Sequence, residues 1–416
     1  MSRIDYRKYV PTAETSKVHG ESARQHAADL ADVPLIKGIL AGWQEMYAAP
    51  YTGMTTDGTV MPGLFKLRSE KAPIEQAIIA ANHLISELTP EQLKSSSFDV
   101  DAKQWRNWQN TEIYFEDFGL RLAEVSDAVR DAILAVMRAS LSAKGYEKSR
   151  NVMRLNGFLG DLVGGPEIFG EFTYLFSLFG TPSASEPWGW QIFGHHLCLS
   201  CLMIGDQMTI TPTFMGGEPC SADEGPHKGL SIFDDEERFG LELMRSFSED
   251  QQAKALIANS MIGGDLPEGR RVHHDGLHLG GAYCDNRIVP YEGLQGVDFT
   301  KLQRRNLLDL VAEYLGTLPP GPFAAKMEDV ERHFADTHFC WIGSREEDQA
   351  FYYRIQSPVT LIEFDHHAGV FLTNPTPMNF HVHTLVRTPN GNDYGVDLIR
   401  QHYENAPHHK DHHHDH

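Results

Sequence analysis

Two apolar stretches stand out in the hydrophobic pattern of the chain, at residues 188–218 and 351–387. Both consist of apolar runs separated by short turns, a pattern that is typical of antiparallel strands covered on both faces. The first stretch predicts two long strands joined at Gly205-Asp206, because glycine and aspartate are common residues of such a turn. Each stretch is expected to form one wall of the core.

The first 165 residues carry a helical pattern instead. Thr89-Pro90-Glu91-Gln92 has the form of a capping box, in which side chains satisfy the free backbone amides of a helix start. After Ser126, apolar residues recur at helical spacing and predict an amphipathic helix that faces the core. Two further capping boxes begin at Ser248 and Thr300.

Together these patterns predict an α+β protein with about seven strands, in largely antiparallel strand meanders surrounded by helices. Residues 1–165 are expected to form a mainly helical N-terminal layer, and residues 166–405 a mixed strand and helix region that packs with it as one compact unit. A weak similarity of TYLFSLFG followed by WGWQI to HFCWIG followed by FYYRI raises the hypothesis of an internal duplication. The histidine-rich end, residues 406–416, is expected to be a disordered tail that binds metals loosely.

The charge balance excludes several classes of partner. A formal net charge of −21, without a lysine or arginine cluster, disfavours binding to nucleic acid or to an anionic membrane surface. The sequence has no run of about eighteen apolar residues, and its first residues lack the apolar segment of a signal peptide. Five cysteines, few and odd in number, fit a reducing compartment. We therefore expect a cytoplasmic protein that acts on a small-molecule substrate, with its oligomeric state left open.

His381 and His383 are the first candidates for a metal site. They are two residues apart on a predicted strand, so both side chains leave the same face and can converge on one ion. Imidazole binds zinc, copper, iron or nickel, and this spacing alone does not choose among them. A structural role for the pair is an equal alternative.

His195, His196 and Glu363 are the candidates that complete this site. The two histidines are adjacent on a predicted strand and point to opposite faces, so at most one is expected to bind the metal while the other packs or supports it. Glu363 lies in an apolar strand, where an unpaired carboxylate is costly to bury, and needs a metal, a histidine or an arginine as its partner. Arg354 is the alternative to a metal.

Aromatic residues near the histidines predict a substrate pocket. Trp188, Trp190 and Tyr353 are expected to wall an apolar cavity, while Gln191 and Arg354 orient a polar or carboxylate group of the substrate. Searches for other catalytic motifs are negative: the sequence has no H-E-x-x-H, no G-x-S-x-G, no Walker loop and no G-x-G-x-x-G after a strand.

The motifs WGWQIFGHHL, YRI with LIEF, and HVH followed by NDYG resemble the DUF3500 family. The resemblance extends over most of the chain, from about Tyr51-Thr52-Gly53 to His402-Tyr403. It implies no activity, because the family name records an unknown function, and it transfers no catalytic residue.

Three functions stay open from the sequence. The first is a mononuclear enzyme with one divalent transition metal ion, held by His381, His383 and one histidine of the 195/196 pair, with Glu363 as a fourth ligand or as the base for hydrolysis. The second is an iron- or copper-dependent oxygenase with the same ligands, and metal identity separates the two. The third is a non-catalytic binding or scaffold protein, whose buried histidines are satisfied by hydrogen bonds in the core.

Overall fold

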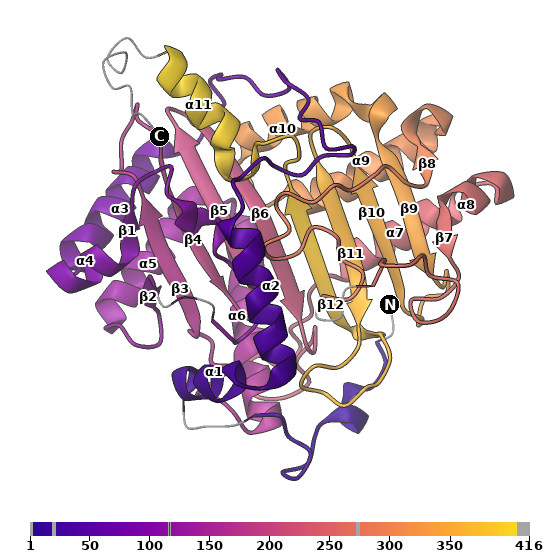
Figure 1. The fold of residues 1–416 in the computed structure, drawn as a ribbon, viewed down its shortest axis with the longest axis horizontal. Helices are drawn as coiled ribbons and strands as arrows, with labels where there is room; N and C mark the ends of the chain where they lie inside the picture. Colours follow the sequence, from indigo (N-terminus) through magenta and orange to yellow (C-terminus); the bar gives the residue numbers. More distant parts are fainter. Residues whose placement is uncertain (1–2, 19–21, 115, 117, 272–274, 406–416) are drawn as a thin grey trace.

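A twelve-stranded sheet runs through the centre of the computed structural model (Figure 1). Its strand order is β1-β3-β4-β5-β6-β12-β11-β10-β9-β7, with β2 paired to β3 and β8 paired to β9. The predicted α+β class is confirmed. The predicted disordered tail lies outside the residues that the structure describes, which are 3–18, 22–114, 116, 118–271 and 275–405.

Eight long strands form two antiparallel meanders. The first consists of β3 (Tyr174–Phe179), β4 (Trp188–Gly194), β5 (Leu197–Ile204) and β6 (Gln207–Gly217). The second consists of β9 (His338–Gly343), β10 (Phe351–Gln356), β11 (Leu361–His367) and β12 (Met378–Arg387). β6 and β12 pair antiparallel, with Phe214 opposite Leu385, and so join the two meanders into one sheet.

The prediction of about seven strands was wrong in number, for two reasons. A turn at His195-His196 divides the stretch before Gly205 into β4 and β5, where one strand was expected. Four further strands are too short to show any alternation of apolar and polar residues. They are β1 (Ser97–Phe98), β2 (Leu120–Arg121), β7 (Leu256–Ala258) and β8 (Leu294–Gln295).

The two halves of the sheet repeat the same order of elements. The order α3, α4, β1, β2, α5, α6 precedes the first meander, and the order α7, α8, β7, β8, α9, α10 precedes the second. β1 pairs parallel with β3, as β7 does with β9. Gln191 lies opposite Ser200 across β4 and β5, as Arg354 lies opposite Glu363 across β10 and β11. The two similar sequence segments therefore occupy corresponding positions, which supports an internal duplication.

Helices cover both faces of this sheet. One face packs against α3 (Ile74–Glu87), α5 (Asp127–Ser140), α6 (Ala143–Val163), α7 (Asp234–Arg245), α9 (Lys301–Leu315) and α10 (Pro320–Arg332). The other packs against α2 (Pro34–Ala48), α11 (Val396–Asn405) and an aromatic segment that includes Trp105 and Trp108. α2 crosses in front of the middle strands in Figure 1. The remaining helices are α1 (Ala23–Ala31), α4 (Pro90–Ser96), α8 (Glu249–Ala255) and the short 3-10 turns η1 (Tyr6–Tyr9), η2 (Lys103–Arg106), η3 (Gly296–Asp298), η4 (Phe334–Asp336) and η5 (Asp393–Gly395).

The helix starts follow from local sequence. The capping boxes predicted at Thr89, Ser248 and Thr300 are formed with both of their hydrogen bonds. The stripe predicted after Ser126 is buried in α5, where Val129 and Ile133 face the core. Among the described residues, every helix is too short or too polar to cross a lipid bilayer.

Candidate metal centre

Four buried histidines gather where β11, β12 and the β4–β5 turn meet. His381 and His383 extend from one face of β12, and their Nε2 atoms lie 3.1 Å apart. The ring centroid of His196 lies 5.3 Å from that of His381 and 5.2 Å from that of His383. His367, at the end of β11, has its ring centroid 4.3 Å from that of His383. The H-x-H spacing therefore brings two imidazoles together, and the fold adds two more.

The β4–β5 turn places His196 in this cluster. His196 has a φ of 64°, a left-handed conformation that is uncommon outside glycine and often marks a functional site. It faces Gly216, which lies opposite His383 in the sheet. A Cβ atom on Gly216 would lie 2.9 Å from Cδ2 of His196 and 3.1 Å from Cδ2 of His383. Only glycine leaves room for both rings.

The expectation that His195 and His196 point to opposite faces of a strand was wrong, because both belong to a turn. Their ring centroids lie 3.8 Å apart. His195 is directed away from the cluster, and its Nδ1 lies 2.7 Å from Oδ1 of Asn156 on α6. Burial lowers the pKa of His195 to about 4, so it is a neutral ring. His196 is thus the member of the pair that lies with His381 and His383.

Two overlapping sets of side chains have the spacing of metal ligands. The ligand atoms of His196, His381 and His383 all lie within 4.8 Å of one another. The same holds for Asp365, His367 and His383. Because Glu363, Asp365 and His367 alternate along β11, all three leave the strand on one face. His383 is common to both sets, so they describe one centre with a choice of ligands.

The histidines of the cluster are neutral, and nitrogen atoms without a proton face its centre. Burial, followed by the neighbouring imidazoles, lowers the pKa of His196, His381 and His383 well below the usual range, so the rings are neutral. Nδ1 of His381 lies 2.9 Å and Nδ1 of His367 lies 3.2 Å from the carbonyl oxygen of Ala368. A carbonyl only accepts hydrogen bonds, so each Nδ1 carries the proton and each Nε2 presents a lone pair.

A metal ion accounts for polar atoms that hydrogen bonding leaves unsatisfied. A proton shared between the Nε2 atoms of His381 and His383 would satisfy those two atoms alone. Within the described part of the chain, Nε2 of His367, Nδ1 of His383 and Oδ1 of Asp365 are buried without a hydrogen bond. Such groups are costly to bury. An ion bound by imidazole nitrogens and a carboxylate oxygen at about 2.0–2.2 Å would satisfy Nε2 of His367 and Oδ1 of Asp365 together.

Two acidic side chains lie behind the histidines. Oδ1 of Asp275 lies 3.8 Å from Nδ1 of His383, and Oε1 of Glu218 lies 3.7 Å from Nδ1 of His381. Glu218 also accepts hydrogen bonds from the backbone amides of residues 370–372, and so fixes the loop that supplies the Ala368 carbonyl. Burial raises the pKa of Asp275 to about 8 and that of Glu218 to about 7. At 3.7 and 3.8 Å neither group hydrogen-bonds to a ring, so Glu218 acts on the centre through the loop.

A cavity of about 300 Å³ opens onto the centre. Ile36, Ile39 and Trp43 of α2 form its apolar side, opposite the histidines and Asp365. Exposed Lys17 and Arg271 also line it. The cavity therefore combines an apolar wall, a set of metal-ligating groups and two cations.

Glu363 has a different environment from the one expected. It is fully buried and accepts hydrogen bonds from the amides of Leu279 and Gly280, at 2.8 Å each, and from the hydroxyl of Tyr352 at 2.7 Å. Burial alone would raise its pKa, but His278, Arg354 and these amides bring the pKa below the usual value. Glu363 anchors the loop after Asp275 and does not line the cavity.

Arg354 also lies away from the histidine cavity. Its guanidinium donates to the carbonyl of Pro290 at 3.0 Å and to Oε2 of Glu292 at 2.8 Å. Arg354 and Glu363 are neighbours across β10 and β11, but Glu292 forms the ion pair. The catalytic roles predicted for Glu363 and Arg354 therefore have no support in this geometry.

The predicted aromatic wall lies on the opposite face of the sheet. Trp188, Trp190 and Tyr353 pack into the core that faces α5, α7 and α9. Nε1 of Trp190 donates to Oγ of Ser140 on α5 at 3.0 Å. Gln191 donates to the carbonyl of Trp105 at 2.7 Å and does not line the cavity either. These four residues stabilise the fold around the centre and do not line its cavity.

Sequence reasoning missed Asp365, His367, Asp275 and Glu218. A signal existed for the first two, because Glu363, Asp365 and His367 continue the strand alternation. Asp275 and Glu218 come from loops, and no local pattern marks them.

A comparison with family models finds a match over residues 70–396, to the family described as "Protein of unknown function (DUF3500)". No curated protein and no solved structure matches the chain.

Proposed function

The chain belongs to the DUF3500 family, and because that family has no described activity, we propose from the geometry of the histidine cavity that the protein is a mononuclear metal-dependent hydrolase of small organic molecules. One observation carries the proposal. The Nε2 atoms of His381 and His383 lie 3.1 Å apart, and the ligand atoms of His196, His381 and His383 all lie within 4.8 Å of one another.

His196, His381 and His383 would hold the ion. Three histidines leave a fourth position for water or substrate, as in catalytic zinc sites. When bound, the metal supplies an activated water for attack on a carbonyl group. Asp365 lies on the same side and would accept the proton of that water. The loop carbonyl of Ala368 holds the imidazole of His381 in the tautomer that binding needs.

The cavity limits the substrate to a small molecule with an apolar part. Its volume of about 300 Å³ is at the low end for ligand pockets. Ile36, Ile39 and Trp43 would contact the apolar part. Lys17 and Arg271 line the cavity together with Glu112 and Asp365, so its charges are balanced and its apolar wall sets the preference.

An iron-dependent oxygenase is the second candidate, and the set Asp365, His367 and His383 favours it. Two histidines and one carboxylate form the ligand set of many non-haem iron oxygenases. In this assignment Asp365 is a ligand, and His196 and His381 support the site. The two candidates thus differ in the metal and in the role of Asp365.

The experiment loads the metal-free chain, ending at Asn405, with zinc or with iron(II) separately. Hydrolysis is measured on a panel of small carboxylic esters and lactones, and oxygen consumption on the same compounds under air. The hydrolase proposal expects turnover with zinc that Asp365→Asn reduces at least a hundredfold without releasing the ion. The exposed Asp336→Asn variant is the control. Oxygen consumption with iron alone, lost together with iron in Asp365→Asn, would replace the proposal with the oxygenase.

A further inference from the structure

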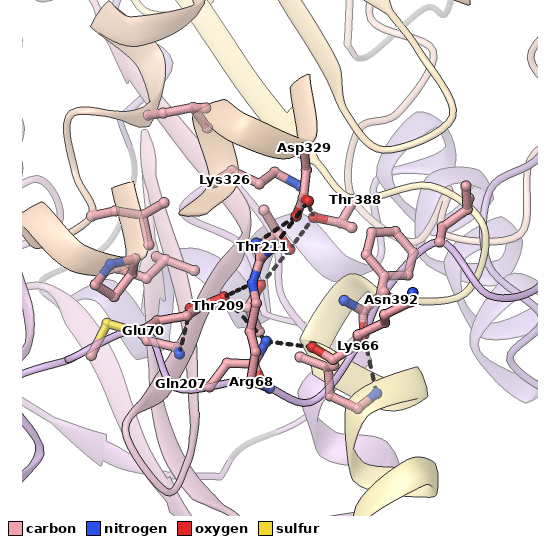
Figure 2. Close-up of a pocket in the computed structure, with 18 of the residues that line it drawn as sticks. Lys66, Arg68, Glu70, Gln207, Thr209, Thr211, Lys326, Asp329, Thr388 and Asn392 are labelled. Atoms are coloured by element: carbon pink, nitrogen blue, oxygen red, sulfur yellow. Dashed lines mark hydrogen bonds and ion pairs between the residues drawn. The ribbon is translucent and has the colours of Figure 1, made fainter. Parts of the chain in front are cut away.

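A second cavity, of about 570 Å³, lies at the other end of the β6–β12 pair (Figure 2). Its lining comes from residues 63–70, from the first half of β6, from α9 and α10, and from Thr388 after β12. The cavity shares no lining residue with the histidine cavity. Neither the family description nor the proposed metal chemistry gives it a role.

The two cavities occupy related positions in the duplicated sheet. Thr209 lies opposite Leu202 across β5 and β6, and His383 lies opposite Asp365 across β11 and β12. Since Ser200 corresponds to Glu363, Thr209 corresponds to His383 and Gln207 to His381. The first meander therefore places hydroxyl and amide groups where the second has imidazoles. Hydroxyl and amide groups are poor ligands for a transition metal, so the positions that hold imidazoles in the second meander do not hold metal ligands here.

Cations outnumber carboxylates in this lining, although the whole chain carries a net charge of −21. The cationic side chains are Lys66, Arg68, Lys326 and Arg332, and the carboxylates are Glu70 and Asp329. Arg68 binds Glu70 at 3.1 Å and Asp329 at 2.8 Å, and Arg332 binds Asp329 at 2.9 Å. Glu328, outside the lining, also pairs with Arg332 at 3.1 Å. Both arginines are therefore paired, and among the described residues the two lysines stay outside these ion pairs.

Lys326 is the partly buried one of these two lysines, whereas Lys66 is exposed. Its ammonium group donates to the carbonyl of Val359 at 2.7 Å and to Oγ1 of Thr388 at 3.4 Å. Among the described residues, no carboxylate lies within ion-pair distance of it. An ammonium has three donors, and these two uncharged acceptors leave one. A partly buried cation without a negative partner is costly.

A row of hydroxyl groups leads away from Lys326. Oγ1 of Thr388 lies 2.9 Å from Oγ1 of Thr211, which lies 3.4 Å from Oγ1 of Thr209. In Figure 2, Lys326, Thr211 and Thr388 point toward one another. A hydroxyl group donates to an anion as readily as it accepts from an ammonium. Three hydroxyls have three protons, and the two contacts between them use two, so the arrangement offers an oxyanion one charged donor and one neutral donor.

We propose that this cavity binds a small molecule through a carboxylate or phosphate group, which accepts hydrogen bonds from the Lys326 ammonium and from the one hydroxyl proton that the Thr388–Thr211–Thr209 row leaves free. The site is independent of the metal centre. Burial lowers the pKa of Lys326 to about 8, although Asp329, Asp393 and Glu70 act in the opposite direction.

Isothermal titration calorimetry at constant ionic strength tests the site on the chain that ends at Asn405. Inorganic phosphate and malonate are the two probes, and they distinguish a phosphate ligand from a carboxylate ligand. We expect saturable binding of at least one probe at pH 7, weakened at least tenfold by Lys326→Gln. Thr388→Val, which keeps the lysine, is expected to weaken binding about threefold to tenfold.

Lys148→Gln is the matched control. Lys148 is also a lysine whose pKa burial lowers to about 8, but it lies on α6 and pairs with Glu236 on α7. Binding should be unchanged in this variant. The proposal is overturned if neither probe binds saturably, or if Lys326→Gln and Thr388→Val, both shown to be folded by circular dichroism, bind the probe as tightly as the unchanged chain.

Discussion

Gly216 is the residue on which the histidine cluster depends most directly for space. Its Cα faces the rings of His196 and His383, and an added Cβ would lie 2.9 Å from the first and 3.1 Å from the second. We predict that Gly216→Ala displaces both rings, lowers metal affinity at least tenfold and lowers the free energy of unfolding by about 1–3 kcal/mol through overpacking. Metal affinity is measured by competition with a chelator, and stability by urea unfolding.

Gly217→Ala is its control, because a Cβ atom there meets its nearest neighbours at 3.4 Å, on the other side of the strand. This variant should keep its metal affinity. Equal loss of metal from the two variants would mean that the rings do not need the space at Gly216.

Lys326 makes stability depend on pH in a defined window. Burial lowers its pKa from 10.5 to about 8 in the folded chain. Between pH 8 and pH 10.5 the unfolded chain then binds more protons than the folded chain, so the free energy of unfolding rises with pH. We predict that the rise between pH 7 and pH 9 is smaller in Lys326→Met, as measured by urea unfolding at both values. An equal rise in the free energy of unfolding in the unchanged chain and in Lys326→Met would contradict a lowered pKa of Lys326.

For single residues, the sequence predicted which side chains share one face of a strand. It did not predict which face of the sheet carries the histidine cluster. His381 and His383 were correctly placed together, since residues two apart leave a strand on the same side. Trp188 and Trp190 also share a face, but it is the face opposite the histidines. Which face of one strand joins which face of another depends on the pairing of distant strands, and no local pattern contains that information.

At the scale of elements, the loop between β11 and β12 supports the metal centre by a hydrogen bond to His381. Glu218 accepts amide hydrogen bonds from Val370, Phe371 and Leu372, and the loop in turn supplies the carbonyl of Ala368. We predict that Glu218→Gln loosens this loop and lowers metal affinity about tenfold to a hundredfold, the usual effect of losing such support. Chelator competition gives the affinity, and hydrogen exchange at residues 370–372 reports the loop.

Glu70→Gln is the matched variant, because Glu70 is also buried and accepts a backbone hydrogen bond, from Met208, but in the second cavity. It should lower stability and leave metal affinity unchanged. Unchanged metal affinity and unchanged exchange in Glu218→Gln would show that the loop is held by other contacts.

Elements were predictable where a local interaction defines them. The three capping boxes and the stripe of α5 were right, because capping and helical spacing act within a few residues. The turn at His195-His196 was missed, since histidine is not a typical turn residue. Each short strand pairs with β3 or β9, and no local pattern predicts such a pairing.

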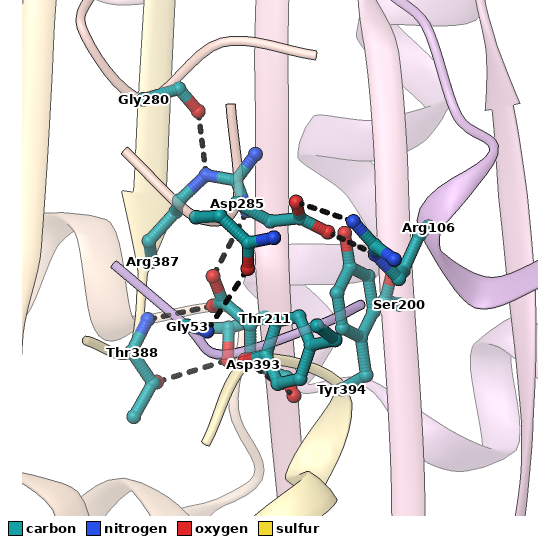
Figure 3. Close-up of polar contacts among 12 residues, drawn as sticks. Gly53, Arg106, Ser200, Thr211, Gly280, Asp285, Arg387, Thr388, Asp393 and Tyr394 are labelled. Carbon is teal, nitrogen blue, oxygen red and sulfur yellow. Dashed lines mark hydrogen bonds and ion pairs between the residues drawn. The ribbon is translucent and has the colours of Figure 1, made fainter. Parts of the chain in front are cut away.

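At the scale of the whole molecule, buried ion pairs connect segments that are far apart in sequence (Figure 3). Arg387 of β12 binds Asp393 of η5 at 2.9 Å and donates to the carbonyls of Gly280 and Gly281. Nearby, Arg106 binds Asp285 at 2.7 Å. The network joins the second meander to the loop behind the metal centre and to the segment before α11.

Removing one member of this network should lower the free energy of unfolding. We predict that Arg387→Met lowers the free energy of unfolding by about 3–5 kcal/mol, because Asp393 is then buried without its cation. Arg387→Met combined with Asp393→Asn should cost less than the sum of the two single changes, as measured by urea unfolding. Additive losses would mean that the pair does not interact.

Metal content tests the central claim most directly. The measurement is elemental mass spectrometry on the chain ending at Asn405, purified without a histidine tag or a nickel column. His381→Ala/His383→Ala removes two ligands, while His195→Ala removes the neighbouring ring that points toward Asn156. We predict near-stoichiometric zinc or iron in the unchanged chain and in His195→Ala, and its loss from the double variant. The absence of metal from all three proteins, even after reconstitution, would contradict a metal enzyme and favour a binding or scaffold protein with structural histidines.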